Sequence, residues 1–202
     1  MKNYDIDKIL RPAFKLFLTN NYESVSTPKL EQESGLTRGA LFYKHKSKAA
    51  LFRAVVDRYI LDFLSQGIAE PNHITLKEYI DTFLTALETR MNGMKALGVE
   101  NIHRGFYNLM YEALKYYPDF DQKISLFFEN GLKGWTAVVQ QALDSGEIES
   151  KSDAVHVARR FQSVYTGIAF ELSLNKGLDV ESLREAYDDY YNSLKCNNSS
   201  IG

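Results

Sequence analysis

The sequence predicts an all-α protein of about nine helices, in which a small three-helix head precedes a larger helical body. Apolar residues recur every three or four positions along most of the chain, the spacing that gathers them on one side of an α-helix. Alternating runs rich in β-branched residues, the pattern typical of strands, are not found. The chain has 202 residues, 45% of them hydrophobic and 25% charged, so it can bury a core like an ordinary globular protein.

The first three predicted helices are short and lie close together in the sequence. The apolar side of the first helix, which ends at the polar stretch NNYES, is expected to be Ile6, Ile9, Leu10, Ala13, Phe14 and Phe17. A second helix is expected from Thr27, whose hydroxyl can cap it, with Pro28 in the first helical position. Gly35 ends this helix. Thr37 can cap the third helix, RGALFY.

Two longer helices follow. Ser47 can cap the fourth, whose wide apolar stripe is expected to be Leu51, Phe52, Val55, Val56, Tyr59, Ile60 and Phe63. The loop GIAEPNHI, residues 67–74, closes it. Thr75 and Glu78 have the spacing of a capping box for the fifth helix. The core side of that helix is expected to be Leu76, Ile80, Phe83, Leu84, Leu87 and Met91.

Glycine and proline bound the remaining helices. The glycine-rich residues 92–105 predict a break before a sixth helix through FYNLMYEALKYY, which Pro118 stops. Asp119 can cap a long seventh helix, whose apolar side is expected to be Ile124, Phe127, Phe128, Leu132, Trp135, Val138, Val139 and Ala142. After the turn DSGEIES, the last two helices carry Ala154, Val157, Ala158, Phe161, Val164, Tyr165, Ile168, Ala169 and Leu172, then Leu183, Ala186, Tyr187, Tyr190 and Leu194.

Composition narrows the class of protein. No run of about 18 apolar residues occurs, and the start MKNYDIDKILR lacks the continuous apolar core of a secretory signal, so we expect a cytoplasmic protein outside the membrane. The single cysteine, Cys196, lies in the polar tail KCNNSSIG, which disfavours a disulfide or a cysteine metal cluster. HExxH, P-loop and GxSxG motifs are missing, so we expect neither an enzyme nor a bound cofactor or metal.

Charge is distributed unevenly. Residues 1–60 contain 11 Lys and Arg against 6 Asp and Glu, whereas the other 142 residues contain 13 against 20. A basic head on an acidic body favours contact of the head with a polyanion. Within the head, Lys44, Lys46 and Lys48 surround the predicted start of the fourth helix, an end that repels cations unless an anion binds there. A phosphate is the natural anion, while a solvated basic loop is the alternative.

Two short helices joined by a glycine-containing turn have the form of a helix-turn-helix, which lays its second helix in the DNA major groove. The string TPKLEQESGLTRGALFYKHKSKAAL resembles the N-terminal signature of the TetR family of bacterial transcriptional regulators. The matching positions are Leu30, Gly35, Leu36, Thr37, Gly39, Leu41, Lys48 and Leu51. The close resemblance covers roughly residues 9–55, and in the rest of the chain only the helix count and the two long final helices agree.

Three residues of the head depart from the family pattern. Glu31 stands where the family usually has Ala, a place where helices approach closely and a large carboxylate is expected to fit badly. Phe42 replaces a Tyr whose hydroxyl can reach a phosphate, and Lys44 and His45 replace a His-Phe pair. Lys44 can supply the lost phosphate contact, whereas His45 lies in a slot that is normally apolar.

The resemblance implies roles for named residues and a division of the chain. Residues 1–48 would be the DNA-binding domain, 49–195 a ligand-binding and dimerisation domain, and 196–202 a polar tail. The base-reading or groove-facing residues would be Thr37, Arg38, Ala40 and Tyr43, with Arg38 the best candidate for a guanine. Gly39 would allow close backbone approach, and Thr27, Lys44 and Lys48 would hold phosphates. For Tyr43, a place in the core is the alternative.

The resemblance also implies a homodimer on double-stranded DNA and release by a small-molecule effector. The last two helices would form the interface, with the tyrosines of EAYDDYYNSL in it or, alternatively, in the protomer's own core. The body is rich in aromatic residues, which suit an apolar or aromatic ligand. The candidate ligand-binding residues are Phe83, His103, Arg104, Phe106, Tyr107, Met110, Trp135 and Tyr165. The competing interpretation is a helical small-molecule- or protein-binding module whose head no longer reads DNA.

Overall fold

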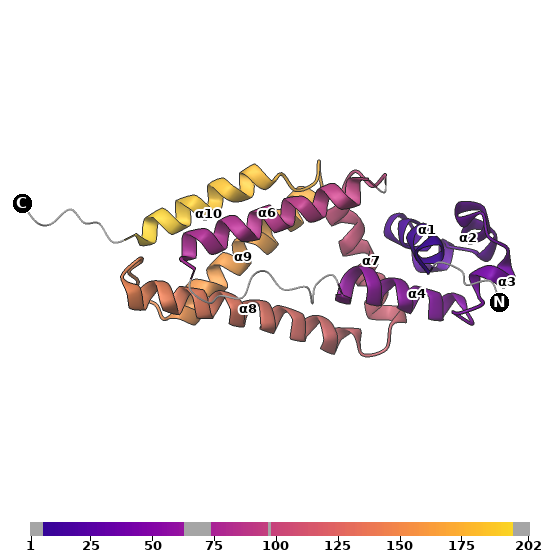
Figure 1. Cartoon of the computed structure of the whole chain (residues 1–202), viewed down its shortest axis with the longest axis horizontal. Helices are drawn as coiled ribbons and strands as arrows, with labels where there is room; N and C mark the ends of the chain where they lie inside the picture. The colour runs from indigo at the N-terminus through magenta and orange to yellow at the C-terminus, as the bar shows by residue number, and fades with distance from the viewer. Residues whose placement is uncertain (1–5, 63–73, 97, 196–202) are drawn as a thin grey trace, which may run out of the picture. The chain divides into compact units, whose positions relative to one another are not determined.

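The computed structural model describes residues 6–62, 74–96 and 98–195, and this part of the chain is all-α, as predicted (Figure 1). It contains nine α-helices, and the only β-type pairing among these residues is an isolated bridge between Ile148 and Lys195. None of the helices in these ranges is both long and apolar enough to cross a membrane. Predictions for Phe63, for loop residues 67–73 and for the tail 196–202 lie outside the described residues.

The chain divides into two compact units that do not follow the order of the sequence. Unit 1 combines residues 1–66 with 97–125, and unit 2 combines residues 67–96 with 126–202. The predicted head therefore shares its unit with a later helix of the body. The functional division at residues 48 and 195 stays a prediction.

Unit 1 contains the three helices of the predicted head and two more. Its α-helices are α1 (Ile6–Thr19), α2 (Thr27–Ser34), α3 (Arg38–Leu41), α4 (Lys48–Val56) and α7 (Ile102–Tyr116). A 3-10 turn, η1 (Tyr22–Ser24), precedes α2, and α4 continues as a π-helix, η2 (Asp57–Leu61). The break before α7 was predicted, but α7 begins four residues earlier than FYNLMYEALKYY because the side chain of Asn101 caps it by accepting from the amide of Arg104.

Local capping explains where the short helices of unit 1 begin and end. The side chains of Thr37 and Ser47 cap α3 and α4, and Gly35 ends α2 in the left-handed conformation with φ 66°, all as predicted. The predicted cap of α2 was wrong by one residue. The Ser26 hydroxyl accepts from the amide of Lys29, and Thr27 is already the first residue of the helix.

The core of unit 1 forms around α1, which packs against α2, α4 and α7. Phe14, Phe17 and Phe52 are almost completely buried there, and Phe17 meets Phe52 edge to face at 5.0 Å. At Gly105 of α7 the backbone runs close to Leu18 of α1. A methyl group on Gly105 would overlap the branch carbon of that leucine.

A buried carboxylate ties α7 to the turn between α1 and α2. The backbone amide of Tyr22 donates to Glu112 Oε2 at 2.7 Å, and Lys115 Nζ donates to Glu112 Oε1 at 3.0 Å. Glu112 is only 6% exposed. A buried charge is tolerated when it is paired and hydrogen-bonded, as this one is. The Tyr22 ring also stacks on Tyr116 of α7 at 4.2 Å, so this helix holds the turn by two kinds of contact.

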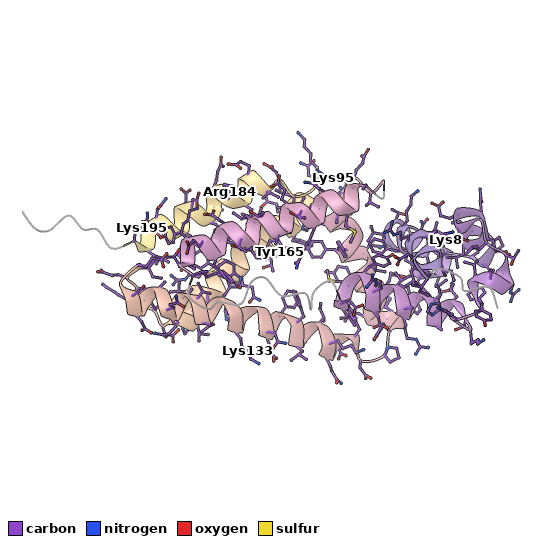
Figure 2. All side chains as sticks on the ribbon, viewed as in Figure 1. Lys8, Lys95, Lys133, Tyr165, Arg184 and Lys195 are labelled. Carbon is purple, nitrogen blue, oxygen red and sulfur yellow. The ribbon has the colours of Figure 1, made fainter. Side chains whose placement is uncertain are left out.

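Unit 2 is built from α6 (Leu76–Lys95), α9 (Ala154–Ser173), α10 (Val180–Leu194) and residues 126–145 of α8 (Phe120–Ser145). The capping box of Thr75 and Glu78 at the start of α6 is present as predicted. Asp119 directly precedes α8 with a left-handed φ of 59°. Two ion pairs join α10 to α6: Lys77 to Asp188 at 2.7 Å and Arg184 to Asp81 at 3.2 Å. Figure 2 labels Arg184 on α10.

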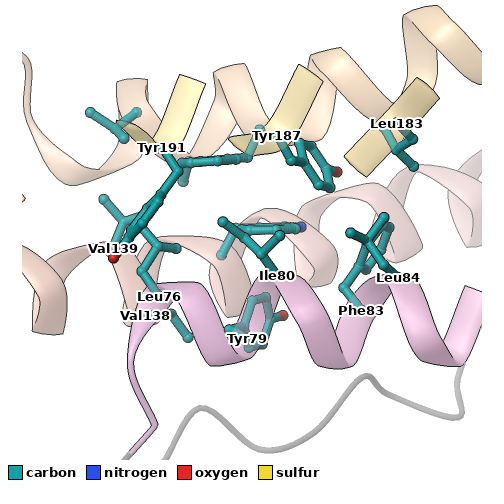
Figure 3. Close-up of a cluster of buried hydrophobic side chains, with 14 of the residues drawn as sticks. Leu76, Tyr79, Ile80, Phe83, Leu84, Val138, Val139, Leu183, Tyr187 and Tyr191 are labelled. Atoms are coloured by element: carbon teal, nitrogen blue, oxygen red, sulfur yellow. The ribbon is translucent and has the colours of Figure 1, made fainter. Parts of the chain in front are cut away.

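The core of unit 2 combines aliphatic side chains with a group of aromatic rings (Figure 3). Trp135 of α8 stacks on Phe161 of α9 at 5.2 Å with an interplanar angle of 3°. Tyr79, Phe83 and Tyr187 surround the same indole within 6 Å. Tyr187 is fully buried in this core. The alternative position, in the protomer's own core, is therefore correct for this tyrosine, and its predicted place in a dimer interface was wrong. The predicted apolar side of α8 also needs correction at Phe128, which is 42% exposed.

Candidate nucleic-acid interface

The segment that begins at Ser26 folds as two short helices joined by a tight turn. α2 ends at Gly35, whose positive φ reverses the chain, and α3 begins three residues later at Arg38. Leu30 of α2 and Leu41 of α3 are at most 1% exposed and attach both helices to the core of unit 1. This is the geometry of a helix-turn-helix, with α3 in the position of the recognition helix.

The outer face of α3 carries most of the residues predicted to read DNA. Thr37, Arg38 and Gly39 are exposed, and Tyr43, just after the helix, is 45% exposed. Exposure of the Tyr43 ring excludes the core position that the sequence left open. Ala40, by contrast, is 8% exposed, and its methyl group faces the core of its own unit.

The three lysines around the start of α4 differ in their surroundings. Lys44 is exposed. Lys46 Nζ donates to the carbonyl of Tyr43 at 2.9 Å and lies 5.7 Å from the centre of that ring. Lys48 Nζ donates to the carbonyl of Tyr22 at 3.0 Å and lies 4.2 Å from the ring centre. Two of the cations are thus held by carbonyl oxygens and aromatic faces of their own chain, which offsets their repulsion from the positive end of α4.

The predicted phosphate contact Thr27 is half-buried at the first turn of α2. It lies next to the capping residue Ser26, which is exposed. Backbone amides at such a helix start are a favourable place for a phosphate oxygen. The phosphate-binding roles of Thr27, Lys44 and Lys48 stay predictions.

Glu31 does not disturb the packing of α2 and α3, contrary to the expectation from the sequence. Its Oε1 atom accepts a hydrogen bond of 2.6 Å from the backbone amide of Arg38, the first residue of α3. The carboxylate therefore turns toward the start of the next helix, where free amides and the helix dipole favour a negative charge.

His45 lies half-buried, and its Nε2 atom is buried with no hydrogen-bond partner among the described residues. Burial, and then the nearby charge of Lys44, lower the pKa of His45 below its usual 6.5. The imidazole therefore occupies the normally apolar slot in its neutral form.

A methyl group on Gly39 tests how closely α3 approaches DNA. A Cβ atom at this position meets nothing within 4 Å, so Gly39→Ala is expected to leave the unfolding midpoint unchanged or slightly raised. If the backbone of α3 lies against the DNA, the same methyl group lowers DNA affinity by about tenfold or more. Thermal unfolding and fluorescence anisotropy with a labelled duplex measure the two effects separately. Equal DNA affinity of the variant and the wild type would contradict the predicted close approach.

The predicted effector residues fall into two groups. His103, Arg104, Phe106, Tyr107 and Met110 all belong to α7 in unit 1, whereas Phe83, Trp135 and Tyr165 belong to unit 2. Within unit 2, Phe83 meets the rings of Trp135 and Tyr165 edge to face at 5.6 and 5.3 Å. Within unit 1, Phe106 packs against Phe14 at 6.1 Å. Their role in binding a ligand stays a prediction.

His103 makes the stability of unit 1 depend on pH. The side chain is 8% exposed, and burial lowers its pKa from 6.5 to about 4. Between these values the unfolded chain binds more protons than the folded one, so stability is complete above pH 6.5 and falls as the pH falls toward 4. Acidification from pH 7.5 to 5 is expected to remove about 2 kcal/mol.

Urea unfolding at several pH values measures this loss. His103→Gln removes the titrating group, and its stability is expected to change much less over the same range. The pKa of His45, in the same unit, is also lowered. His45→Gln should therefore reduce the pH dependence of stability as well, but by a smaller amount. A His103→Gln profile parallel to that of the wild type would show that other groups cause the acid sensitivity.

Comparison with known proteins agrees with this geometry. The family profile described as "Bacterial regulatory proteins, tetR family" matches residues 9–55. The HTH-type transcriptional repressor ComR of Escherichia coli (strain K12) is 38% identical over 69 residues, which are 34% of this chain. The chain thus matches only 33% of the length of that relative.

Solved structures resemble the whole chain in fold. A TetR transcription regulator from Haloarcula marismortui superposes with a TM-score of 0.71 at 18% identity, over 94% of this chain and 97% of that one. A TetR-family regulator from Agrobacterium tumefaciens gives 0.68 at 17% identity, also over 94% and 97%. A short α2–turn–α3 unit whose second helix exposes Arg38 and Gly39, followed in the described residues by further helices, is the architecture of a helix-turn-helix protein. The sequence of the head, residues 9–55, matches the profile of the TetR family, and the fold of the chain resembles that of solved TetR-family regulators.

Sequence reasoning named Thr37, Arg38 and Gly39, which the structure leaves exposed, but it missed two contacts that support the head. The bond from Glu31 to the amide of Arg38 was not anticipated, although a carboxylate near a helix start is a recognisable signal. The attachment of Lys48 to Tyr22 was missed as well. The two residues are 26 positions apart, and no local pattern connects them.

Proposed function

We propose that this protein is a transcriptional regulator of the repressor type, whose head binds double-stranded DNA. The observation that carries the proposal is the exposure of Arg38 in α3 and of Tyr43 and Lys44 just after it, in a segment that matches the family profile. The description of ComR as a transcriptional repressor supports the direction of regulation.

In this proposal the residues of the head divide the work of recognition. Arg38 pairs with a guanine in the major groove, and Tyr43 makes a second contact there. Lys44, Lys48 and Thr27 hold backbone phosphates, which position the head without reading sequence. The bond from Lys48 to the Tyr22 carbonyl leaves this role possible, because an ammonium group has three donors and the bond uses one.

A single helix of this length reads few base pairs, so we propose that two copies bind a palindromic operator. The last two helices, α9 and α10, form the proposed dimer interface. Val155, Phe170 and Leu174 at the ends of α9 are 44%, 46% and 66% exposed. At 3.6 residues per turn they fall within about 100° of one another around the helix. Exposed apolar side chains on one side of a helix are typical of protein interfaces.

A charge at one of these exposed apolar positions is expected to weaken the dimer. Leu174→Glu places a carboxylate in the proposed interface, where desolvation without a partner is costly. We expect sedimentation equilibrium to show a dimer for the wild type and a dissociation constant raised at least about tenfold for the variant. Lys176→Glu, on an exposed residue beyond α9, changes the charge by two units instead of one and is therefore a stringent control for added negative charge. A variant that stays as dimeric as the wild type would place the interface elsewhere.

We propose further that a small apolar or aromatic effector binds the body and releases the protein from DNA. For this the effector must bind more tightly to a form of the dimer in which the two heads no longer match the operator spacing. The aromatic residues Phe83, Trp135 and Tyr165, which meet one another within unit 2, are the proposed contacts. Since its partner is the bacterial chromosome, the protein would act in the cytoplasm.

Selection of bound duplexes from a random DNA pool at moderate salt tests the proposed function. The wild type is expected to enrich an inverted repeat. Arg38→Ala should cost about 1–3 kcal/mol on the enriched sequence and relax the preference at one position of each half-site. Lys44→Ala should weaken binding to all sequences and reduce the dependence of affinity on salt. Lys151→Ala, an exposed lysine in unit 2, is the control for loss of charge.

The outcomes separate the two interpretations of the chain. An inverted repeat that depends on Arg38 would establish a sequence-specific dimeric regulator. Failure to enrich any sequence, at any salt concentration and after removal of bound small molecules by refolding, would refute the proposal. A helical binding module whose head no longer reads DNA would then be the better description.

A further inference from the structure

The start of the recognition helix is held by a residue of the preceding helix. α3 has four residues, and the amide of its first residue, Arg38, donates to Glu31 Oε1 at 2.6 Å. The hydrogen bond of its capping residue is longer: the amide of Ala40 donates to Thr37 Oγ1 at 3.4 Å. The first amides of a helix have no partner within it, so α3 depends on these two side chains. The bond from Glu31 is the shorter of the two and involves a charge.

A helix of one turn cannot maintain itself, because forming the first turn costs more than its single internal bond returns. Its orientation must come from contacts with the rest of the head. Glu31 follows Leu30, which is 1% exposed, and the same helix is tied to α1 by an ion pair of 3.0 Å between Glu33 and Lys15. Glu31 therefore connects the backbone of Arg38 to a helix that is itself fixed in two ways.

We propose that Glu31 is a positioning residue for DNA reading: its carboxylate sets the backbone at Arg38, so that the guanidinium reaches one base. The inference rests on the proposed function. It assigns a role to a residue that differs from the Ala usual in the family, where no such bond is possible. It also gives a role to a carboxylate in a basic head, where its negative charge would repel the phosphates of bound DNA.

Three variants separate the hydrogen bond from the charge. Glu31→Gln keeps an oxygen that can accept from the Arg38 amide but removes the charge. Glu31→Ala removes both and restores the residue usual in the family. Glu33→Ala removes one charge from the same helix together with its ion pair to Lys15, so it is the control for charge and for the attachment of α2 to α1. Each is measured against the selected operator and against a scrambled duplex of the same composition.

We expect Glu31→Ala to lower operator affinity by about tenfold and to change affinity for the scrambled duplex by less than about threefold, because the lost contact orients a base-reading side chain. Glu31→Gln and Glu33→Ala should stay within about threefold of the wild type on the operator. Operator affinity of Glu31→Ala equal to that of the wild type would overturn the inference. So would an equal loss in Glu31→Gln and Glu31→Ala, since charge alone would then explain both.

A measurement without DNA reports the hydrogen bond itself. In an NMR measurement of amide hydrogen exchange, the amide proton of Arg38 should exchange faster in Glu31→Ala than in the wild type, while Glu31→Gln should keep the slower rate. The amide of Gly39 is the internal comparison. An Arg38 exchange rate that is equal in the wild type and in Glu31→Ala would overturn the inference even if DNA binding is normal.

These experiments also distinguish failure of the inference from failure of the proposed function. If the wild type enriches no sequence, the proposed function fails and the role of Glu31 in reading fails with it. If the wild type binds its operator and Glu31→Ala binds equally well, only the role of Glu31 fails. Thermal unfolding of each variant shows whether unit 1 is intact, and rescue of operator affinity by Glu31→Gln remains decisive where Glu31→Ala unfolds.

Discussion

Replacing Trp135 by Ala is expected to lower the free energy of unfolding of unit 2 by about 3–5 kcal/mol. The indole is 4% exposed and is enclosed by Phe161, Tyr79, Phe83 and Tyr187. Its removal deletes a large apolar surface and leaves a cavity that four rings from other helices cannot close without losing their own contacts. Urea unfolding followed by circular dichroism measures the change, because the chain has only one tryptophan and loses its fluorescent probe.

Phe128→Ala is the matched control, since Phe128 lies two turns earlier on the same helix and is 42% exposed. Its loss is expected to cost less than about 1 kcal/mol. A similarly small cost for Trp135→Ala would mean that the indole borders a space rather than a packed core. That result would favour its predicted contact with an effector over a structural role.

Gly105→Ala is expected to destabilise unit 1 by up to about 2 kcal/mol, although alanine is the better helix former. The gain in helix propensity is about 1 kcal/mol. Against it, the added methyl group would overlap Leu18 Cγ and lie 3.0 and 3.1 Å from the two methyl carbons of that leucine. Leu18 is 2% exposed, and the overlapping atom is its branch point, so the side chain cannot turn away. Overpacking of this kind costs about 1–3 kcal/mol or more.

A double-mutant cycle with Leu18→Ala identifies the cause. In the Leu18→Ala background there is room for the methyl group, so Gly105→Ala should become neutral or stabilising. Gly93→Ala, in α6, is the control for helix propensity, because a Cβ atom there meets nothing within 4 Å. It should stabilise unit 2 by about 0.5–1 kcal/mol. Equal costs of Gly105→Ala in both backgrounds would exclude the overlap with Leu18 as the cause.

The features that the sequence predicted correctly are those fixed by neighbouring residues. Thr37, Ser47 and the pair Thr75 and Glu78 cap their helices as expected, because each bond closes within three residues. Gly35 ends α2 for the same local reason. Helical spacing of apolar residues gave the all-α fold, since it depends only on the period of the helix.

The errors arose where distant contacts decide the structure. Glu31 was expected to fit badly, but the start of α3 offers its carboxylate an amide that only the folded head brings near. Tyr187 was expected in an interface because tyrosines are common there, yet the rings of three other helices bury it. The residue types in the sequence indicate that a tyrosine will be buried, but they do not show whether its own core or a second protomer buries it.

The attachment of Lys46 and Lys48 to their own head has a consequence for the entropy of DNA binding. A long side chain that moves freely in solution loses conformational freedom when it is fixed against a phosphate, at a cost of about 0.5–1.5 kcal/mol for each chain. Bonds to the carbonyls of Tyr43 and Tyr22 restrict these two lysines before any DNA arrives. The head would therefore meet its operator with much of that ordering already complete, and only the exposed Lys44 would lose its full freedom on binding.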